Sequence, residues 1–399
     1  MISKENIIYS LKNIWERKSR SFLTLLSIFI GIATIFIFVS FGWGLYAYID
    51  EISGEGSADK FTLEGKGFGA PGTSSVELGE DELDVVEGTK GVLEAEGAYF
   101  KATEVEQNGV KKYFYLIGAD FDKQLIMGVG NVGLYKGRLL KNGDSGKVAL
   151  GYNYQFDDKN FPKGLNLNDK IKIEGEKYRI VGFLEEVGNP ADDANIYMDI
   201  DSYEKIFPDE SYAMIIGRAN IDEMEEVVNR VKKEVREFRD EEEGKEEFNV
   251  ASFQDQIEAF TGALDIVIAF IILIALISVV VSAVNTANTM VTSVLERIRE
   301  IGVIKSIGAK NSEIFNIFLF ESSFLGLLAG IIGVLLGSLI ATIAGASLSA
   351  LGWGFLQPYQ SWTIFAGGIA FATIVGAISG IVPAIQASKL KPVDALRYE

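Results

Sequence analysis

Four long apolar runs divide this chain, and a long polar segment separates the first run from the other three. The runs predict membrane-spanning helices at 22–48, 263–287, 314–339 and 364–385. At 1.5 Å per helical residue, each run is long enough to cross about 30 Å of hydrocarbon. The pattern therefore predicts an α-helical membrane protein with four transmembrane helices.

The polar segment, 49–260, has the periodicities of a mixed α+β domain. In chain order it predicts strands at 60–64, 93–106, 111–118, 213–219 and 247–251, and helices at 81–90 and 222–239. A glycine-rich, strand-rich stretch at about 120–200 interrupts this series. The order βαββ, insertion, βαβ predicts a ferredoxin-like lobe that carries an inserted β-rich lobe.

The end of the polar domain predicts a rigid connection to the membrane. Ser252 is followed three residues later by Asp255, which is the spacing of a helix cap. Only Gly262 interrupts the helical pattern before the second span. A single helix over 252–287 would be about 54 Å long.

Charge along the chain predicts its orientation. Segments 1–21, 288–313 and 386–399 together carry 12 Lys or Arg and 7 Asp or Glu, whereas 49–260 carries 25 and 46. Short loops rich in Lys and Arg stay in the cytoplasm. We therefore expect both termini and 288–313 to be cytoplasmic, with 1–21 as an amphipathic helix at the membrane surface. The polar domain and the aromatic loop 340–363 are then extracytoplasmic.

Composition excludes several chemistries. The chain has no Cys and no His, so it offers no thiol chemistry and lacks the commonest general base and metal ligand. A net charge of −18 argues against a nucleic-acid partner. The chain has no ATP-binding loop of the type G-x-x-x-x-G-K-[ST]. Gly128–Gly133 matches G-x-G-x-x-G, but its β-rich context favours a glycine-rich turn. We expect no enzymatic activity, bound cofactor or metal site in this chain.

The loop between the second and third spans, 288–313, predicts a short amphipathic helix. Its sequence from Glu296 is ERIREIGVIKSIGAK, with isoleucines at helical spacing and charged residues between them. Gly308 and Ala309 end the helical pattern. Such a helix contacts either a soluble partner or lipid headgroups, and periodicity favours neither.

The charged residues inside the predicted spans are both acidic: Asp265 and Glu321. Asp265 lies near the outer end of its span, where we expect it to reach water. Glu321 is about two turns inside the third span. It is either a proton or ion relay, or a polar contact within the bundle or at the cytoplasmic interface.

Several stretches resemble one protein family. The loop sequence ERIREIGVIKSIGAK resembles the coupling segment of the MacB/FtsX/LolC-type permeases of ABC systems. The resemblance includes the apolar run that follows it, with Glu321 near its start. GIVPAIQASKLKPVDALRYE at the end of the chain is similar to the MacB-like C-terminus. The segments 10–36 and 164–186 resemble the entry to the first span and part of the extracytoplasmic core domain. Because the sequence contains no ATP-binding loop, we expect a permease of this type without a fused ATPase domain.

The resemblance implies a permease subunit that works as a homodimer with a separate ATPase. That partner would bind ATP and Mg²⁺ and would grip the coupling segment. The contact residues implied are Glu296, Arg297, Glu300, Ile301, Gly302, Ile304, Gly308 and Ala309. ATP hydrolysis would then drive export or extraction of a substrate at the outer membrane face. Two alternatives remain: a force transmitter that regulates an extracellular enzyme or sensor, and a membrane-anchored adhesion or structural ectodomain.

Overall fold

The structure is a computed structural model that describes residues 18–53, 57–67, 76–130 and 132–396. It divides into two compact units. One unit is helical and comprises the chain before residue 46, residues 264–347 and the chain after residue 355. The other comprises 46–263 together with the short segment 348–355. Most of the expected N-terminal helix, 1–21, lies outside the described residues.

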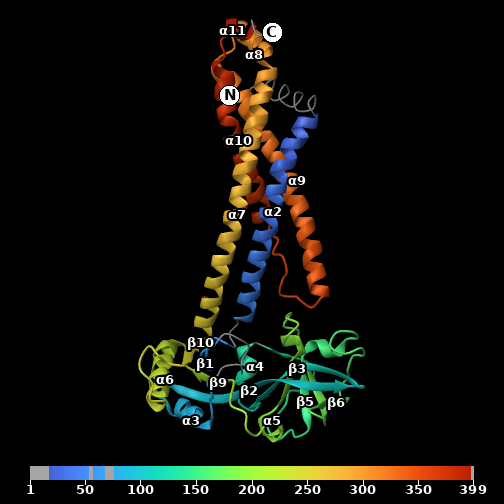
Figure 1. Ribbon diagram of the computed structural model, residues 1–399, viewed down its shortest axis with the longest axis vertical. Helices are drawn as coiled ribbons and strands as arrows, with labels where there is room; N and C mark the ends of the chain where they lie inside the picture. The colour runs from blue at the N-terminus through green and yellow to red at the C-terminus, as the bar shows by residue number, and fades with distance from the viewer. Residues whose placement is uncertain (1–17, 54–56, 68–75, 131, 397–399) are drawn as a thin grey trace. The chain divides into compact units, whose positions relative to one another are not determined.

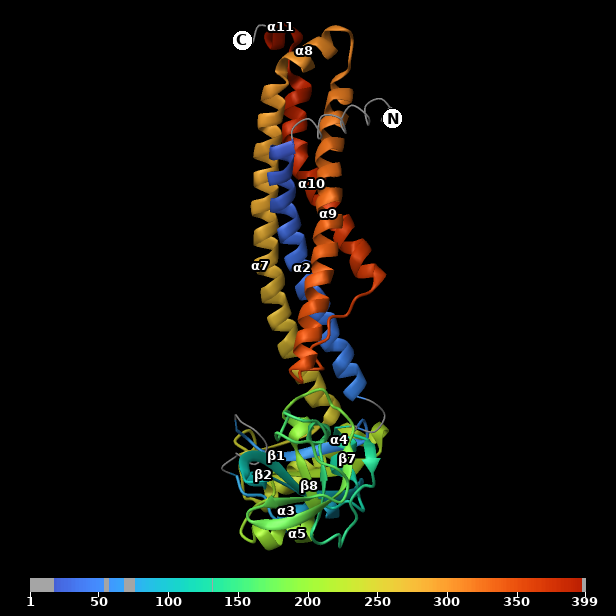
Figure 2. The same cartoon turned by 90° about the vertical axis from the view of Figure 1, so that its right-hand side faces the viewer.

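Four long helices build the helical unit: α2 (Lys18–Ile52), α7 (Phe253–Glu296), α9 (Asn311–Ala350) and α10 (Trp362–Lys389). They run side by side (Figures 1 and 2). Each contains one predicted span, and among the described residues these four are long and apolar enough to cross a membrane. Two short helices, α8 (Ile298–Ser306) and α11 (Pro392–Leu396), lie beyond α7 and α10 in the chain.

Glycines let α9 approach two neighbours closely. A Cβ on Gly326 would lie 2.6 Å from the carbonyl oxygen of Ala372, and one on Gly376 would lie 2.9 Å from the Cα of Gly326. These positions bring α9 and α10 into backbone contact. A Cβ on Gly333 would instead lie 2.8 Å from the carbonyl oxygen of Phe29. The small residues of α9 therefore form two seams, one against α10 and one against α2.

Helix α7 is continuous from Phe253 to Glu296, with no break at Gly262. Its 44 residues correspond to about 66 Å. The predicted cap is present. The amide of Asp255 donates to Ser252 Oγ over 3.0 Å, and the amide of Ser252 donates to an oxygen of Asp255 over 3.2 Å.

The first lobe of the other unit is ferredoxin-like. Its strands are β1 (Lys60–Gly65), β2 (Val92–Gln107), β9 (Met214–Ala219) and β10 (Phe248–Ser252), paired antiparallel in the order β10-β1-β9-β2. Helices α3 (Glu80–Gly88) and α6 (Met224–Phe238) pack together and contact the sheet. Val227, Val231 and Val235 of α6 recur at helical spacing and are fully buried in the core with Phe61 and Phe248. This confirms the predicted α+β fold class.

The second lobe is inserted between β2 and β9. Its strands are β3 (Val110–Ala119), β4 (Leu134–Gly137), β5 (Lys147–Leu150), β6 (Lys170–Ile173), β7 (Glu176–Leu184) and β8 (Ile196–Asp199). The pairings β2-β3-β8-β5-β7-β6 return to β2, so this part of the sheet closes on itself. Short helices α4 (Leu125–Val129) and α5 (Ile200–Ile206) complete the lobe.

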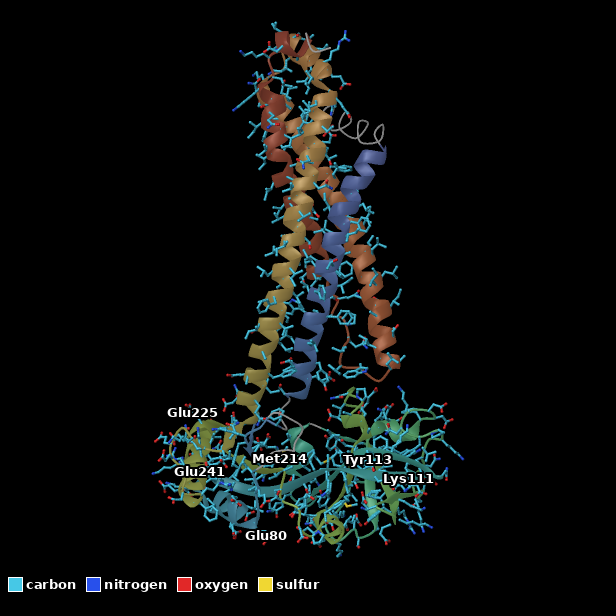
Figure 3. The ribbon with its side chains drawn as sticks, in the orientation of Figure 1. Glu80, Lys111, Tyr113, Met214, Glu225 and Glu241 are labelled. Carbon is cyan, nitrogen blue, oxygen red and sulfur yellow. The ribbon has the colours of Figure 1, made fainter. Side chains whose placement is uncertain are left out.

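One predicted element belongs to the other lobe. We expected the strand at 111–118 to extend the ferredoxin-like layer, but β3 pairs with the outer half of β2 and with β8. The insertion therefore begins before the expected residue 120, and long β2 is shared. Its first half pairs with β9 and its second half with β3. Glu225, on helix α6, and Lys111, on strand β3, lie on opposite sides of this unit (Figure 3).

Candidate coupling site

Helix α8 is a short, sharply bounded element between α7 and α9. Gly308, at φ +109°, ends it. The amide of Gly308 donates to the carbonyl of Lys305 over 3.1 Å, and the amide of Ala309 donates to that of Ile304 over 3.3 Å. These two bonds form a Schellman motif, which requires a left-handed residue and so favours glycine. The predicted end at Gly308 and Ala309 is confirmed.

One face of α8 is buried against the helical unit. Ile298 and Ile301 are 6% and 2% exposed, and Ile301 packs in a cluster with Ile314, Phe318 and Ala384. At its C-terminal end, Lys305 Nζ donates to the carbonyl oxygens of Ser388 and Leu390 over 2.8 and 2.6 Å. Lys305 thereby satisfies carbonyl groups that the end of α10 leaves without helical partners. These contacts fix α8 to α9 and α10.

A buried ion pair adds a further connection. Arg297, just before α8, is 3% exposed, and its Nη1 lies 3.1 Å from Glu321 Oε2 on α9. The Arg297 guanidinium also lies 5.0 Å from the centre of the Phe318 ring and 3.2 Å from Glu300 Oε2. A cation over an aromatic face is favourable, more so away from water. Of the two expectations for Glu321, the structure matches a polar contact inside the bundle.

The other face of α8 is open. Val303 is 49% exposed and Ile307, which follows the last turn, is 83% exposed. Arg299 and Glu300 are also exposed and add a charge of each sign. Two exposed apolar side chains four residues apart, flanked by charges, form a surface suited to a groove on another protein. We call Arg299, Glu300, Val303 and Ile307 the α8 outer face.

The structure divides the residues expected to contact a partner. Glu296, Glu300 and Gly308 are exposed, and Ile304 and Ala309 are half-buried. Arg297, Ile301 and Gly302 are buried in the helical unit. The resemblance implied Ile301 as a contact residue and did not include Val303 or Ile307. Their separation by four residues, on the same side as Arg299 and Glu300, was the signal that would have found them. Asp265, the other charge in a span, is exposed on α7.

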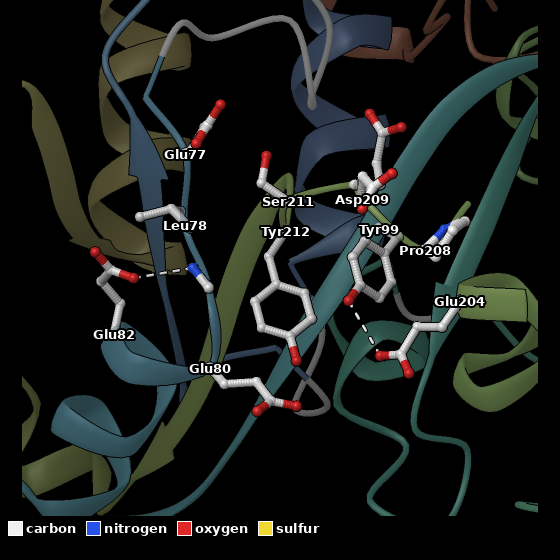
Figure 4. Close-up of a pocket in the computed structure, with 12 residues that line it drawn as sticks. Glu77, Leu78, Glu80, Glu82, Tyr99, Glu204, Pro208, Asp209, Ser211 and Tyr212 are labelled. Atoms are coloured by element: carbon white, nitrogen blue, oxygen red, sulfur yellow. Dashed lines mark hydrogen bonds between the residues drawn. The ribbon is translucent and has the colours of Figure 1, made fainter.

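The unit formed by 46–263 and 348–355 contains the polar domain expected outside the cytoplasm, and we call it the extracytoplasmic unit. It has an acidic hollow of about 680 Å³ (Figure 4). Tyr99 and Tyr212 form its aromatic wall, with their ring centres 4.7 Å apart. Its carboxylates come from Glu77, Glu80, Glu82, Glu204, Asp209 and Glu210. Several have partners within the protein: Glu82 pairs with Arg239 over 2.6 Å, Glu204 accepts from Tyr99 Oη over 3.1 Å, and Glu210 pairs with Lys101. These contacts join elements of both lobes.

Among the described residues, no three acidic side chains are placed so that they could hold one metal ion together. The glycine motif at 128–133 begins inside α4, and the strand β4 follows it. A dinucleotide site needs a strand before the motif and a helix after it. The geometry instead fits the expected glycine-rich turn.

Comparison with known proteins decides the family. Residues 21–234 match the MacB-like periplasmic core domain, and residues 260–392 match the FtsX-like permease C-terminal domain. The chain is 32% identical over 397 residues to an uncharacterized ABC transporter permease of Methanocaldococcus jannaschii, covering 98% of both proteins.

The chain belongs to the MacB/FtsX-type ABC transporter permeases.

Other relatives fit this family. The permease is 27% identical to the uncharacterized ABC transporter permease YknZ of Bacillus subtilis over 99% of both chains. It is 26% identical to the macrolide export ATP-binding/permease protein MacB of Mannheimia succiniciproducens, and it spans 60% of that longer protein. The periplasmic region of MacB from Actinobacillus actinomycetemcomitans aligns with 51% of this permease at 13% identity, with a TM-score of 0.40.

Proposed function

We propose that this chain is the permease subunit of an ABC system, that it works as a homodimer, and that a separate cytoplasmic ATPase binds its α8 outer face. ATP-driven closure of the ATPase pushes α8. The buried contacts of α8 pass that push to the long helices, which rearrange the extracytoplasmic domain and move a substrate at the outer membrane face. ATP and Mg²⁺ are bound by the partner.

The two-sided character of α8 is the observation that carries this proposal. Its inner face is fixed by Ile301, Lys305 and the Arg297–Glu321 pair, while Val303 and Ile307 remain open. A force applied to the outer face therefore moves α8 together with α9 and α10 rather than bending α8 away from them. The distribution of Lys and Arg supports placing both termini and α8 in the cytoplasm.

One observation argues against a central channel through the helical unit. A hollow between α2 and α10, about 240 Å³ in volume, is lined by apolar side chains and glycines. It offers no polar path for a hydrophilic solute. Movement of a substrate on the outer face, or mechanical control of another extracellular protein, is therefore favoured over a central channel.

Co-purification tests the assigned surface. The ABC ATPase that co-purifies with the tagged wild-type chain from its own membranes is identified and then co-expressed with variants. Ile307→Asp should reduce its recovery at least about tenfold, because a charge would enter an apolar contact. Ile221→Asp is the matched control, since Ile221 is an exposed isoleucine of the extracytoplasmic domain. Equal recovery with Ile307→Asp and with wild type would reject the α8 outer face as the binding surface.

A further inference from the structure

The last three residues of α9 and the five residues after it belong to the extracytoplasmic unit, whereas most of α9 belongs to the helical unit. Residues 348–355 cluster with 46–263. The helix ends at Ala350, and Gly352 at φ +94° turns the chain. Such a turn favours glycine, because a side chain is strained there. The next helix begins only at Trp362.

Hydrogen bonds hold this segment to the inserted lobe. The amide of Phe355 donates to the carbonyl oxygen of Gly188 over 3.1 Å. Lys159 Nζ donates to the carbonyl oxygen of Ala350 over 3.0 Å. Gly188 follows β7 and Lys159 lies between β5 and β6, so both belong to the inserted lobe.

Close packing accompanies these bonds. A Cβ on Gly188 would lie 3.0 Å from the amide nitrogen of Phe355, so the two backbones meet where no side chain fits. The Phe355 ring lies 5.5 Å from the Tyr48 ring and 5.6 Å from the Trp353 ring, centre to centre. Aromatic pairs at this spacing add to the stabilisation from burial.

The side chain of Asp193 sets the position of Gly188. Asp193 is 1% exposed, and each of its carboxylate oxygens accepts one backbone hydrogen bond. Oδ1 accepts from Val187 over 2.7 Å and Oδ2 accepts from Gly188 over 3.0 Å. Hydrogen bonds to an ionised carboxylate are stronger than those between neutral groups. The carboxylate therefore fixes the backbone at Gly188, whose carbonyl oxygen accepts the hydrogen bond from the Phe355 amide.

We propose that this contact is a further tether between the membrane helices and the extracytoplasmic domain, besides the chain connections from α2 and to α7, and that Asp193 is the residue that positions it. Helix α7 leads directly from β10, in the ferredoxin-like lobe. Helix α9 leads, through Phe355 and Gly188, to the inserted lobe. The ferredoxin-like lobe is thus joined to α7 and the inserted lobe is held to α9, so a displacement of α9 relative to α7 shifts one lobe against the other.

The proposal concerns how the proposed function is carried out, but the tether itself can be tested without an ATPase. The first experiment measures amide hydrogen exchange of the full chain in lipid nanodiscs. Asp193→Asn removes the charge and one acceptor oxygen from the loop. The expected result is an increase of about tenfold in the exchange rate of the Phe355 amide, which bonds to Gly188 rather than to Asp193.

The matched control is Asp192→Asn. Asp192 is the adjacent acidic residue and accepts from the Asn189 side chain over 2.8 Å, not from the Val187 or Gly188 amides. It should leave the Phe355 amide as protected as in the wild type. If Asp193→Asn accelerates exchange at the Val187 and Gly188 amides but not at the Phe355 amide, the proposed tether through Gly188 is refuted.

A second experiment tests what the tether transmits. Spin labels on each lobe report their distance with and without ATP, in the complex with the co-purified ATPase. In the wild type, the distance between the two labels should change when ATP is added. In the double variant Lys159→Met with Asp193→Asn, that change should be at least about twofold smaller, while recovery of the ATPase stays the same. An undiminished change in that variant overturns the role of the tether. No change in the wild type overturns the proposed lobe movement, whereas the exchange result still decides whether the tether exists.

Discussion

Arg297 Nη1 lies 3.1 Å from Glu321 Oε2, and both side chains are more than nine-tenths buried. The pair joins the start of α8 to α9 across 24 positions of sequence. In the proposed function, α8 is the element at which the ATPase applies force. This ion pair is then one of the contacts through which that force reaches α9.

Breaking the Arg297–Glu321 pair should destabilise the helical unit. Glu321→Leu would leave the Arg297 guanidinium buried without this carboxylate, at a cost of about 3–5 kcal/mol. Thermal unfolding of the purified chain in detergent would measure the loss. The exchanged pair Arg297→Glu with Glu321→Arg should recover part of the lost stability. If Glu321→Leu unfolds at the same temperature as the wild type, the ion pair does not contribute to the stability of the fold.

The two faces of α8 should differ in how strongly an introduced aspartate destabilises the fold. Ile301→Asp places a charge in the cluster around Phe318 and should lower thermal stability, with little folded protein recovered. Val303→Asp lies on the open face and should change the melting temperature by only a few degrees. Fluorescence-detected size-exclusion chromatography with heating measures both. Similar losses for the two variants would contradict the assignment of inner and outer faces.

Glycine packing between α9 and α10 should tolerate no added carbon. Gly326→Ala would place its Cβ 2.6 Å from the carbonyl oxygen of Ala372, and the overpacking should cost about 1–3 kcal/mol. Gly367→Ala in α10 is the matched control, because a Cβ there meets nothing within 4 Å. The control should be neutral or slightly stabilising, since alanine favours helix over glycine. Equal melting temperatures for the two variants would refute the close approach.

Buried Glu96 should make the extracytoplasmic domain less stable as the pH rises. Glu96 is 1% exposed, Oε1 accepts from the Ile126 amide over 2.6 Å, and Oε2 has no partner among the described residues. Burial raises the pKa of Glu96 to about 8. The folded domain therefore retains a proton that the unfolded chain releases. The resulting stabilisation is complete below about pH 4.5 and is lost as the pH rises to about 8, at about 1.4 kcal/mol per pH unit.

The variant Glu96→Gln checks this pH dependence. It resembles the protonated acid and should raise the melting temperature at pH 9 while changing it little at pH 4. Glu94→Gln, on the same strand, removes a partly exposed carboxylate that pairs with Arg218 and should give no gain at pH 9. Scanning calorimetry of the full chain measures both variants. A Glu96→Gln curve parallel to wild type across this range would mean that Glu96 is already ionised in the fold.

Local signals predicted much of this structure. The apolar runs located the four long helices, Ser252 and Asp255 marked the start of α7, and Gly308 marked the end of α8. Each depends on neighbouring residues alone. The lobe to which β3 belongs depends instead on β8, which lies almost eighty residues further along the chain. Alternation of side chains identifies a strand but not its partner.

The sequence predicted a short helix where α8 lies, but it did not predict which face of that helix is buried. Both faces of α8 carry apolar residues, Ile298 and Ile301 on one and Val303 and Ile307 on the other, so periodicity does not say which is buried. Arg297 was expected to contact the partner, but it is buried in the helical unit. Its partner, Glu321, lies one helix later, and only the folded bundle brings them together.

Site-specific photo-crosslinking from the α8 outer face tests the central claim most directly. A benzoylphenylalanine at position 307, in membranes that contain the co-purifying ATPase, should form a covalent adduct with that ATPase. The same group at position 221 should form none. An adduct from position 307 is the predicted result. Failure to crosslink at 307 while the ATPase still co-purifies would contradict the account, because the partner would then bind this permease elsewhere.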